Sequence, residues 1–355
     1  MNNKKNKYAV ALSGGVDSST TAAILLNQGY EIFGVTMLTQ QNGCQNVIDR
    51  ASEVAKQLCI EHYIFDVIDE FKKEVIDYFI NSYLNGITPN PCAICNRKIK
   101  LNKLLAFAQE KGADYLATGH YANIDYINNN LYLRESKNLL KDQSYFLSLT
   151  SKEHLKYIKT PLCNIQNKQE TRDLAKKFGL NNFQEQDSQD ICFIRNGDYI
   201  SFIRENMEDK SLLDNHGDVI LKNTNNIISQ HKGLINYTIG QRRGLGIANK
   251  EPLYVTKIDI NNNALIVGNK RDLIIKEFQV NQLNWLLNIN NNEFECYVKV
   301  RAGHSKYKSL VRIVDNDTIS ITLLEDNTVA ICPGQICALY KNDNVVIGAG
   351  IIKQY

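Results

Sequence analysis

Short apolar runs alternate with helical patterns through the first third of the chain, and this alternation constrains the fold more than any other feature. The patterns predict strands over Tyr8–Leu12, Ile32–Leu38, His62–Val67 and Tyr115–Thr118, and helices over Ser18–Asn27, Val47–Leu58 and Lys103–Glu110. Strands that alternate with helices form βαβ units and a parallel sheet. In such sheets ligands bind at the carboxyl ends of the strands.

The pattern changes after about Arg204. From Gly217 onward, short alternating runs are separated by Asn, Asp and Gly, and helical patterns are scarce. This part predicts one or two small β domains or barrels. The expected fold class is therefore α/β, with an N-terminal parallel-sheet domain followed by small β domains.

Bulk properties exclude several classes of protein. The 41 Lys and Arg residues nearly balance 38 Asp and Glu residues, so any nucleic-acid contact must use local basic patches. No apolar run is long enough for a transmembrane helix, and the N-terminus lacks the apolar core of a secretion signal. We therefore expect a cytoplasmic protein with no membrane contact. Nine cysteines, an odd number, do not suggest a framework of structural disulfides.

The first strand–helix junction carries Ala11-Leu-Ser-Gly-Gly-Val-Asp-Ser18. Two glycines permit close approach of a ligand, and backbone N–H groups and hydroxyls at a helix N-terminus can hold phosphate. The loop resembles the pyrophosphate loop of the ATP-pyrophosphatase superfamily, whose members cleave ATP between the α and β phosphates. A plain Gly-rich turn is the alternative. Asp17 is a candidate Mg²⁺ ligand, although helix N-termini favour Asp in any case.

Two further segments carry candidate thiols. Thr88-Pro-Asn-Pro-Cys-Ala-Ile-Cys-Asn96 contains Cys92 and Cys95, and its two prolines predict an ordered loop rather than a helix interior. Lys98 and Lys100 are expected to favour the thiolate form. Asp187-Ser-Gln-Asp-Ile-Cys-Phe193 carries Cys192.

Three other interpretations of these cysteines stay open. Each could be a buried core residue. Cys92 and Cys95 could begin a zinc site, although no second pair of Cys or His at similar spacing is evident. An iron–sulfur cluster held by Cys92, Cys95 and Cys192 is a further alternative, less favoured than two reactive thiols.

Six motifs occur in the order found in tRNA-specific 2-thiouridylases, and nearly the whole chain resembles that family. They are the Ser-Gly-Gly-Val-Asp-Ser loop, Asn-Pro-Cys-x2-Cys-Asn, Thr118-Gly-His-Tyr121, Lys141-Asp-Gln-Ser-Tyr-Phe146, Asp187-Ser-x2-Ile-Cys-Phe193 and Gly240-Gln-Arg-Arg-Gly-Leu-Gly246. The resemblance implies a pyrophosphate-loop catalytic domain over 1–206, a central β domain over 207–272 and a C-terminal β-barrel that contacts tRNA over 273–355.

The resemblance also implies a mechanism. ATP, with Mg²⁺, would activate the carbon 2 oxygen of the wobble uridine, position 34, as an O-adenylate. Cys192 would carry a persulfide that supplies sulfur, Cys95 would be the nucleophile that resolves the sulfur–sulfur bond, and a Cys95–Cys192 disulfide would result. The expected partners are tRNAs for Lys, Glu and Gln and a sulfur donor, such as a cysteine desulfurase or a sulfur-relay protein.

Binding residues follow from the same resemblance. The expected ATP-binding residues are Ala11, Leu12, Ser13, Gly14, Gly15, Val16, Asp17, Ser18, Met37 and Gly119. The expected tRNA-binding residues are Asn90, Pro91, Cys92, His120, Lys141, Asp142, Gln143, Arg301 and Gln335. No dedicated metal site is expected. For His120 a structural role is an equal alternative. For any single lysine, an ordinary solvated position on the surface is an equal alternative.

The chain departs from the family after Met37, where Leu38–Cys44 is short and neutral instead of long and acidic. This puts the contribution of that stretch to a lid or a metal site in doubt. Two other functions compete with thiolation: a ligase or amidotransferase of the same ATP-pyrophosphatase superfamily, and an RNA-binding module without catalysis. A ligase would not need two placed thiols, and a binding module would release no AMP.

Overall fold

The computed structural model of the chain describes residues 6–40, 44–128, 130–185, 191–194, 197–211, 213–325 and 330–354. Its N-terminal part contains a five-stranded parallel sheet in the order β3-β2-β1-β4-β7. The strands are β1 (Lys7–Ala11), β2 (Glu31–Leu38), β3 (Glu61–Asp66), β4 (Tyr115–Ala117) and β7 (Ile158–Lys159). The predicted parallel sheet is confirmed, and only the two-residue strand β7 was too short for a pattern to indicate.

Helices cover both faces of this sheet because successive side chains of a strand point to opposite sides. Val10 and Ile32 pack with α1 (Val16–Asn27), α2 (Gln45–Gln57) and α9 (Lys168–Lys177). Ala9 and Phe33 pack on the other face with α5 (Pro91–Cys95), η2 (Asn96–Lys103) and α6 (Leu104–Glu110). The sheet is therefore buried on both sides, as parallel sheets usually are.

The N-terminal part contains further helices and a hairpin. A helical run consists of α3 (Ile68–Phe71), the π-helical η1 (Lys72–Ile76) and α4 (Asp77–Leu84), with Phe71, Val75 and Phe79 at most 1% exposed. A hairpin of β5 (Asn123–Ile127) and β6 (Asn130–Arg134) follows β4. Three short helices complete this part: α7 (Ser144–Leu147), α8 (Lys152–Leu155) and α10 (Tyr199–Asn206).

Two β units follow, as expected. The central sheet has the order β10-β11-β8-β9, and the last six strands close into a barrel in the order β12-β15-β14-β13-β16-β17. The central strands are β8 (Gly217–Leu221), β9 (Asn226–His231), β10 (Tyr254–Asp259) and β11 (Ala264–Gly268), with the 3₁₀ turns η4 (Leu234–Asn236) and η5 (Lys270–Leu273). The barrel strands are β12 (Glu277–Trp285), β13 (Glu293–Lys299), β14 (Tyr307–Ile313), β15 (Thr318–Leu323), β16 (Ile336–Tyr340) and β17 (Val346–Ile352).

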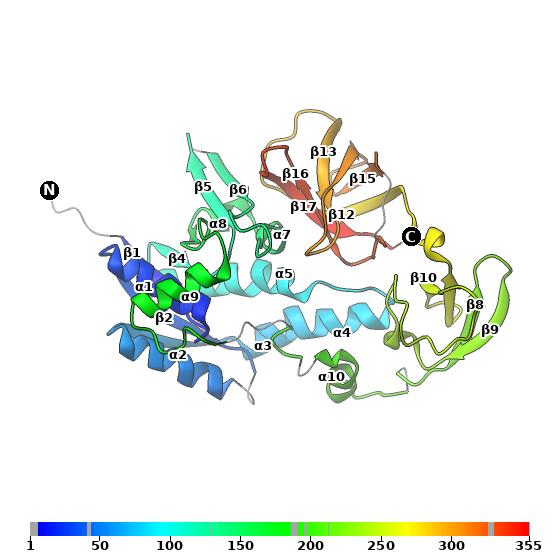
Figure 1. Ribbon diagram of the computed structural model, residues 1–355, viewed down its shortest axis with the longest axis horizontal. Coiled ribbons are helices and arrows are strands. Elements are labelled where there is room, and N and C mark those ends of the chain that lie inside the picture. The colour runs from blue at the N-terminus through cyan, green and yellow to red at the C-terminus, as the bar shows by residue number, and fades with distance from the viewer. Residues whose placement is uncertain are drawn as a thin grey trace.

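The barrel packs directly on the N-terminal domain. Leu286, Ile336, Tyr340 and Val346 share one buried cluster with Phe33 and other residues of the N-terminal sheet layer. In Figure 1 the barrel, in orange and red, lies above α4 and the segment that leads into α5. The central sheet lies at the far end of the molecule from β1 (Figure 1). This arrangement lets both β units reach the segment between α4 and α5.

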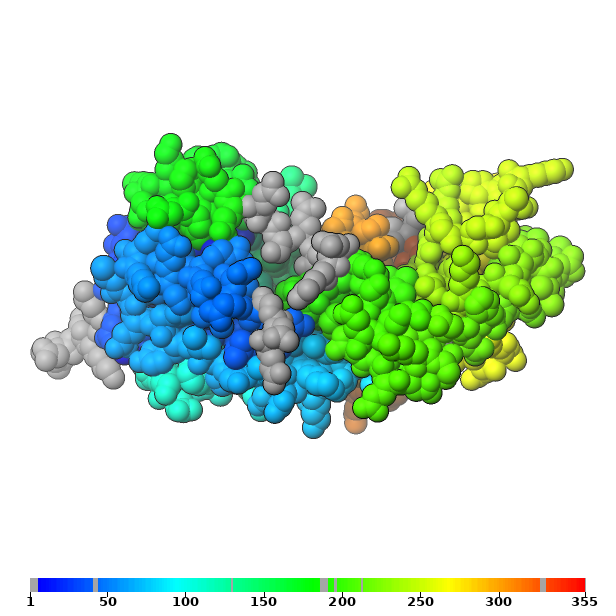
Figure 2. Space-filling view, turned by 90° about the horizontal axis from the view of Figure 1, so that it is seen from below, coloured from blue at the N-terminus to red at the C-terminus, as the bar shows by residue number. Residues whose placement is uncertain are grey.

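Seen from below, the green surface that includes α10 lies between the blue N-terminal domain and the yellow-green central sheet (Figure 2). Phe202 of α10 packs its ring on Phe79 and Phe193, so this helix covers the cluster that carries residues 191–194. Among the described residues, none of the helices is both long and apolar enough to cross a membrane.

Candidate active site

The loop that the sequence predicts to bind phosphate lies, as expected, between the end of β1 and the start of α1. Gly14 has φ +74°, and a Cβ there would lie 2.5 Å from Cβ of Arg50, so only glycine fits. The hydroxyls of Ser13 and Ser18 lie 3.1 Å apart, and Ser18 Oγ donates to Gly15 O at 3.0 Å. The residues from Ala11 to Ser18 thus form a preformed turn at the N-terminus of a helix, where an anion is favoured.

Met37 and Gly119 lie beside this loop because β2 and β4 are the two neighbours of β1 in the sheet. Met37 lies near the end of β2, and Gly119 follows β4. A Cβ on Gly119 would lie 3.0 Å from both Cβ of Asp17 and N of Ser18. The ten residues expected to bind ATP therefore meet at one edge of the sheet.

Asp17 is held by residues from two distant segments. Its Oδ1 accepts hydrogen bonds from Tyr121 Oη and from Lys168 Nζ, each at 2.7 Å. Lys168 is the first residue of α9, and its side chain is only 15% exposed. Lys168 was not among the predicted site residues. Its signal was a cation at a helix N-terminus, which the helix dipole disfavours unless an acidic partner is near.

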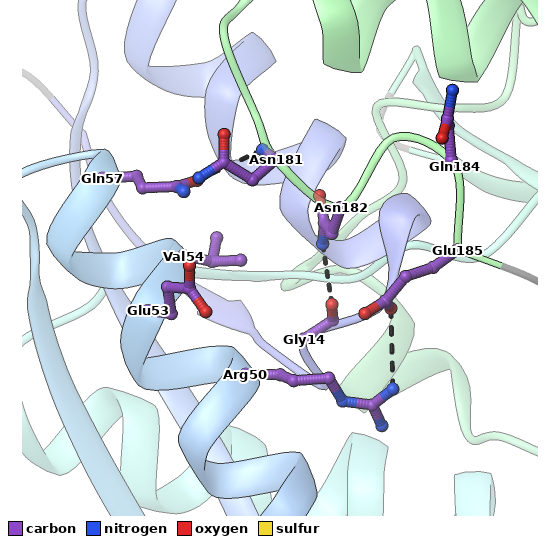
Figure 3. A pocket seen from close by; sticks show the side chains of 9 residues that line it. All are labelled: Gly14, Arg50, Glu53, Val54, Gln57, Asn181, Asn182, Gln184 and Glu185. Carbon is purple, nitrogen blue, oxygen red and sulfur yellow. Dashed lines mark hydrogen bonds and ion pairs between the residues drawn. The ribbon is translucent and has the colours of Figure 1, made fainter.

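Asn182 is a second residue that sequence analysis missed. From the turn after α9, its Nδ2 donates to Gly14 O at 2.7 Å (Figure 3). The same Nδ2 donates to Ser19 Oγ at 2.8 Å. Figure 3 also shows Arg50 of α2 facing Glu185, with Nη1 3.6 Å from Oε2. These residues line a polar pocket of about 370 Å³ that borders the loop at Gly14. No local pattern marks Asn182, because its partners lie more than 160 residues away.

Cys92 and Cys95 lie on the short helix α5, so the predicted ordered loop is wrong at these two positions. Asn90 caps the helix by accepting a hydrogen bond from Ala93 N at 3.2 Å, and Pro91 is its first residue. A proline at the first helical position loses nothing, since its missing N–H has no partner there. Asn90 and Pro91 therefore start a helix here.

The charge of Cys192 influences the pKa of Cys95, so the two thiols lie near each other although they are far apart in the sequence. Cys95 and Ile191 pack against one apolar cluster, and Phe193 is buried within it with edge contacts to Phe71 and Phe79. Met37 packs against the same cluster, which links the thiols to the edge of the sheet. Asp187, Ser188, Gln189 and Asp190 of the Cys192 motif lie outside the described residues.

Lys100 favours the thiolate forms as predicted, but desolvation outweighs it and raises the pKa of all three thiols. Burial raises the pKa of Cys95 to about 12, although the charge of Lys100 lowers it. Desolvation likewise raises the pKa of Cys92 and of Cys192, again against Lys100. Lys98 instead pairs with Glu74 at 3.7 Å. Cys92, Cys95 and Cys192 nevertheless lie close enough for the charge of Cys192 to raise the pKa of the other two.

The described residues contain no group of three or more His, Cys, Asp and Glu side chains placed to hold a metal ion. Cys92, Cys95 and Cys192 are all free thiols.

Two residues of the predicted tRNA motif point inward. The side chain of Asp142 is 1% exposed and accepts hydrogen bonds from Ser136 N at 2.9 Å and Ser144 Oγ at 2.7 Å. Gln143 Oε1 accepts from Tyr121 N at 2.9 Å. Asp142 was expected to bind tRNA, but its carboxylate is buried and hydrogen-bonded within the protein. Lys141 is exposed, as predicted.

Some of the other residues predicted to contact RNA are exposed, and others are buried or bonded within the protein. Arg301 and Cys92 are exposed, whereas Asn90 and Pro91 are buried at the start of α5. His120 is buried and bonded through Nδ1 to Thr118 Oγ1 at 2.8 Å, and burial lowers its pKa to about 3. This arrangement favours its structural alternative. Gln335 bonds the backbone of Thr88 and Pro89.

Comparisons with known proteins identify the family. Three family models match in order: the tRNA methyl transferase HUP domain over residues 6–196, the tRNA methyl transferase PRC-barrel domain over 202–269 and the aminomethyltransferase beta-barrel domain over 275–352. Among solved structures, a 4-thiouridine synthetase in complex with RNA and ATP is similar over 56% of this chain and 50% of its own, with 17% identity and a TM-score of 0.36.

Curated relatives match over the full length. The tRNA-specific 2-thiouridylase MnmA 1 of Fusobacterium nucleatum is 42% identical over 99% of this chain and 95% of its own length. The tRNA-specific 2-thiouridylase MnmA of Rickettsia peacockii is 41% identical over 100% of this chain and 99% of its own. With two full-length relatives at this identity, this chain belongs to the tRNA-specific 2-thiouridylase family.

Proposed function

We propose that this protein is a tRNA sulfurtransferase that converts the wobble uridine, position 34, to 2-thiouridine, with ATP as the activating substrate. The observation that carries the proposal is that Cys95 and the two neighbours of Cys192, Ile191 and Phe193, share one cluster that also contacts Met37, beside the phosphate-binding loop. A ligase of the same ATP-pyrophosphatase superfamily would need the loop but not the paired thiols. Family membership supports the same activity.

The proposed reaction has two stages. In the first, the carbon 2 oxygen of the uridine attacks the α-phosphorus of ATP, pyrophosphate leaves, and an O-adenylate forms. In the second, the terminal sulfur of a Cys192 persulfide attacks carbon 2 and AMP leaves. Attack by the Cys95 thiolate on Cys192 Sγ then breaks the sulfur–sulfur bond, which leaves 2-thiouridine and a Cys95–Cys192 disulfide. An external dithiol reductant must reduce this disulfide before the next cycle.

The phosphate loop would hold the pyrophosphate part of ATP through its backbone N–H groups and the hydroxyls of Ser13 and Ser18. Asp17 is the carboxylate of the loop and would hold Mg²⁺, which prefers one or two carboxylates together with phosphate oxygens. When bound, Mg²⁺ would neutralise charge that develops on the leaving pyrophosphate. Lys168, now paired with Asp17, lies within reach of the same phosphates.

Thiols with a raised pKa suit a reaction in which the thiolates form only after substrate has bound. A thiol that stays protonated until substrate is bound is protected from oxidation, because the thiolate is the reactive form. Lys100 lowers the pKa of both Cys95 and Cys192, so it is the cation that would favour their ionisation during the reaction. Exposed Lys141 and Arg301 are the residues best placed to contact tRNA phosphates.

The tRNAs for Lys, Glu and Gln, a cysteine desulfurase or relay protein as sulfur donor, and a cytoplasmic location stay predictions. The reaction itself can be tested directly. Protein, ATP, Mg²⁺, a persulfide source and unmodified tRNA are incubated, and the nucleosides are analysed by mass spectrometry. We expect 2-thiouridine together with tRNA-dependent release of AMP.

Substitution of the thiols separates the proposal from its rivals. Cys192→Ser and Cys95→Ser are expected to abolish thiolation, because each removes a sulfur that the transfer needs. Cys59→Ser changes an exposed thiol at the end of α2 and is the matched control, with unchanged activity. Full product formation by Cys192→Ser would support a ligase, and absence of tRNA-dependent AMP release would support an RNA-binding module.

A further inference from the structure

The segment of residues 85–90 joins α4 to α5 and carries no secondary structure of its own. It leads directly into the helix that holds Cys92 and Cys95. In Figure 1 this segment runs extended beneath the barrel. Its position therefore decides where the helix with the proposed nucleophile begins.

The central β domain contacts the start of this segment. Gly86 has φ +67°, and a Cβ there would lie 2.9 Å from Cγ2 of Ile258 in β10. It would also lie 3.2 Å from two carbons of Ile260, which follows β10. The segment thus touches the central domain as closely as its backbone allows.

The barrel contacts the rest of the segment through the turn of residues 333–335. Thr88 N donates a hydrogen bond to Pro333 O at 3.1 Å. A Cβ on Gly334 would lie 2.2 Å from Cγ2 of Ile87 and 2.9 Å from Thr88 O, so the turn can approach only as glycine. Gln335 Nε2 donates to Thr88 O and to Pro89 O, both at 3.0 Å.

These bonds fix the direction of the Gln335 side chain. A primary amide has two N–H donors, and in Gln335 both are directed to backbone carbonyls of the segment. The backbone of the turn is itself anchored, because Gly334 N donates to Ile352 O and Ile352 N donates to Gln335 O, each at 2.9 Å. The donors of Gln335 are therefore engaged within the protein.

We propose that Gln335 is a positioning residue for Cys95, which acts by holding the segment before α5 against the barrel. This inference rests on the proposed function, in which Cys95 resolves the sulfur–sulfur bond. The barrel thereby takes part in the reaction as a support for the catalytic helix as well as a contact for tRNA. Because Pro89 adjoins the capping residue Asn90, loss of the two bonds frees the start of α5.

The experiment compares Gln335→Met with Gln279→Met in the full-length protein. Methionine has a similar length but no donor, so it removes both bonds with little change in volume. Gln279 lies on β12 of the same barrel, where its Oε1 accepts from Lys353 at the exposed surface, and it is the matched control. Three quantities are measured: kcat for thiolation, Kd for unmodified tRNA, and the alkylation rate of Cys95 followed by peptide mass spectrometry.

For Gln335→Met we expect kcat to fall about tenfold, since small displacements of a catalytic group have effects of this size. The Kd for tRNA is expected to stay within about twofold, and Cys95 to alkylate several times faster because α5 moves more freely. Gln279→Met is expected to match the wild type. A weaker Kd with unchanged kcat and unchanged Cys95 alkylation would overturn the proposal and make Gln335 an RNA contact.

The alkylation measurement needs neither tRNA nor thiolation. Should the wild-type protein fail to thiolate tRNA, the proposed function is wrong. Faster alkylation of Cys95 in Gln335→Met would still demonstrate that Gln335 holds the segment before α5 in place. Unchanged alkylation in a folded Gln335→Met protein overturns the hold whatever the outcome for thiolation. A Gln335→Glu variant, whose carboxylate repels both carbonyls, should alkylate at least as fast as Gln335→Met.

Discussion

One lysine influences all three thiols near the proposed reaction centre. The charge of Lys100 lowers the pKa of Cys92, Cys95 and Cys192, although in each case desolvation outweighs it. It also contributes to the low pKa of buried His120. Lys98, only two residues away, pairs with Glu74 at the surface instead. Proximity in the sequence therefore does not decide which lysine acts on a thiol.

Lys100→Met is expected to slow alkylation of Cys95 by iodoacetamide about threefold to tenfold at pH 8. Without the cation the pKa of Cys95 rises further above about 12, and the reactive thiolate becomes rarer at any fixed pH. Lys98→Met is the matched control and should alkylate at the wild-type rate. Equal effects of the two substitutions would contradict a specific role for Lys100.

Buried His120 leads to a prediction about how the stability of the protein depends on pH. Its folded-state pKa of about 3 lies below the ordinary value, so the unfolded chain takes up a proton near pH 6.5 while the folded protein does not. Stability is therefore lost as pH falls below about 6.5, by about 2 kcal/mol at pH 5.

His120→Gln removes this loss, so the stability difference between wild type and variant should shrink by about 2 kcal/mol between pH 7 and pH 5. Urea denaturation at both pH values measures it. His216→Gln changes an exposed histidine and is the control. A constant difference for His120→Gln would mean that His120 becomes protonated in the folded protein.

At the scale of elements, residues from α9 and from the turn after it complete the phosphate loop. Helix α9 brings Lys168 to Asp17, and the turn after it brings Asn182 to Gly14. The phosphate loop has no lysine of its own, unlike the Gly-x4-Gly-Lys loop of other nucleotide-binding proteins. A distant helix therefore supplies the cation that the loop lacks.

Lys168→Met is expected to raise the KM for ATP and to weaken inhibition by magnesium pyrophosphate, each about tenfold, because a phosphate-facing charge is lost. Lys177→Met, an exposed lysine at the other end of α9, should leave both unchanged. The double variant Asp17→Asn/Lys168→Met removes the whole ion pair. Full recovery of pyrophosphate inhibition in the double variant would show that Lys168 serves only to neutralise Asp17.

At the scale of the whole molecule, the barrel and the N-terminal domain share a core. Tyr340 of β16 is fully buried and lies with its hydroxyl 3.0 Å from Ser144 Oγ of α7, and Lys306 pairs with Glu135 at 2.8 Å. Asn284 Nδ2 donates to Ser148 O and Thr150 O. Polar and apolar contacts therefore join these two parts as one folding unit.

Leu286→Ala should lower the free energy of unfolding by about 2–5 kcal/mol, the usual effect of a cavity in a core. Leu286 is 1% exposed within the cluster that contains residues of both parts. Probes in the barrel and in the N-terminal sheet should therefore lose structure in one shifted transition. Leu140→Ala, at a side chain 98% exposed, is the control, and separate transitions for the two probes would contradict a shared core.

Resemblance to a family singled out Cys95 and Cys192, whereas the sequence by itself determined the parallel sheet, the phosphate loop at its first junction and the change to β structure. These follow from local causes: periodic burial, the need for glycine at a positive φ, and residue type. The same local signals gave no warning of Lys168 or Asn182. They also favoured a loop where Asn90 and Pro91 start a helix.

Only the tertiary structure decided which polar groups are free to act. Asp142, His120 and Gln335 carry suitable chemistry for RNA, but long-range contacts bury them or engage their polar atoms. The same contacts keep Cys95 protonated and join Lys168 to Asp17 across 151 residues of chain. Burial and ion pairing depend on which distant segments meet, and no local pattern carries that information.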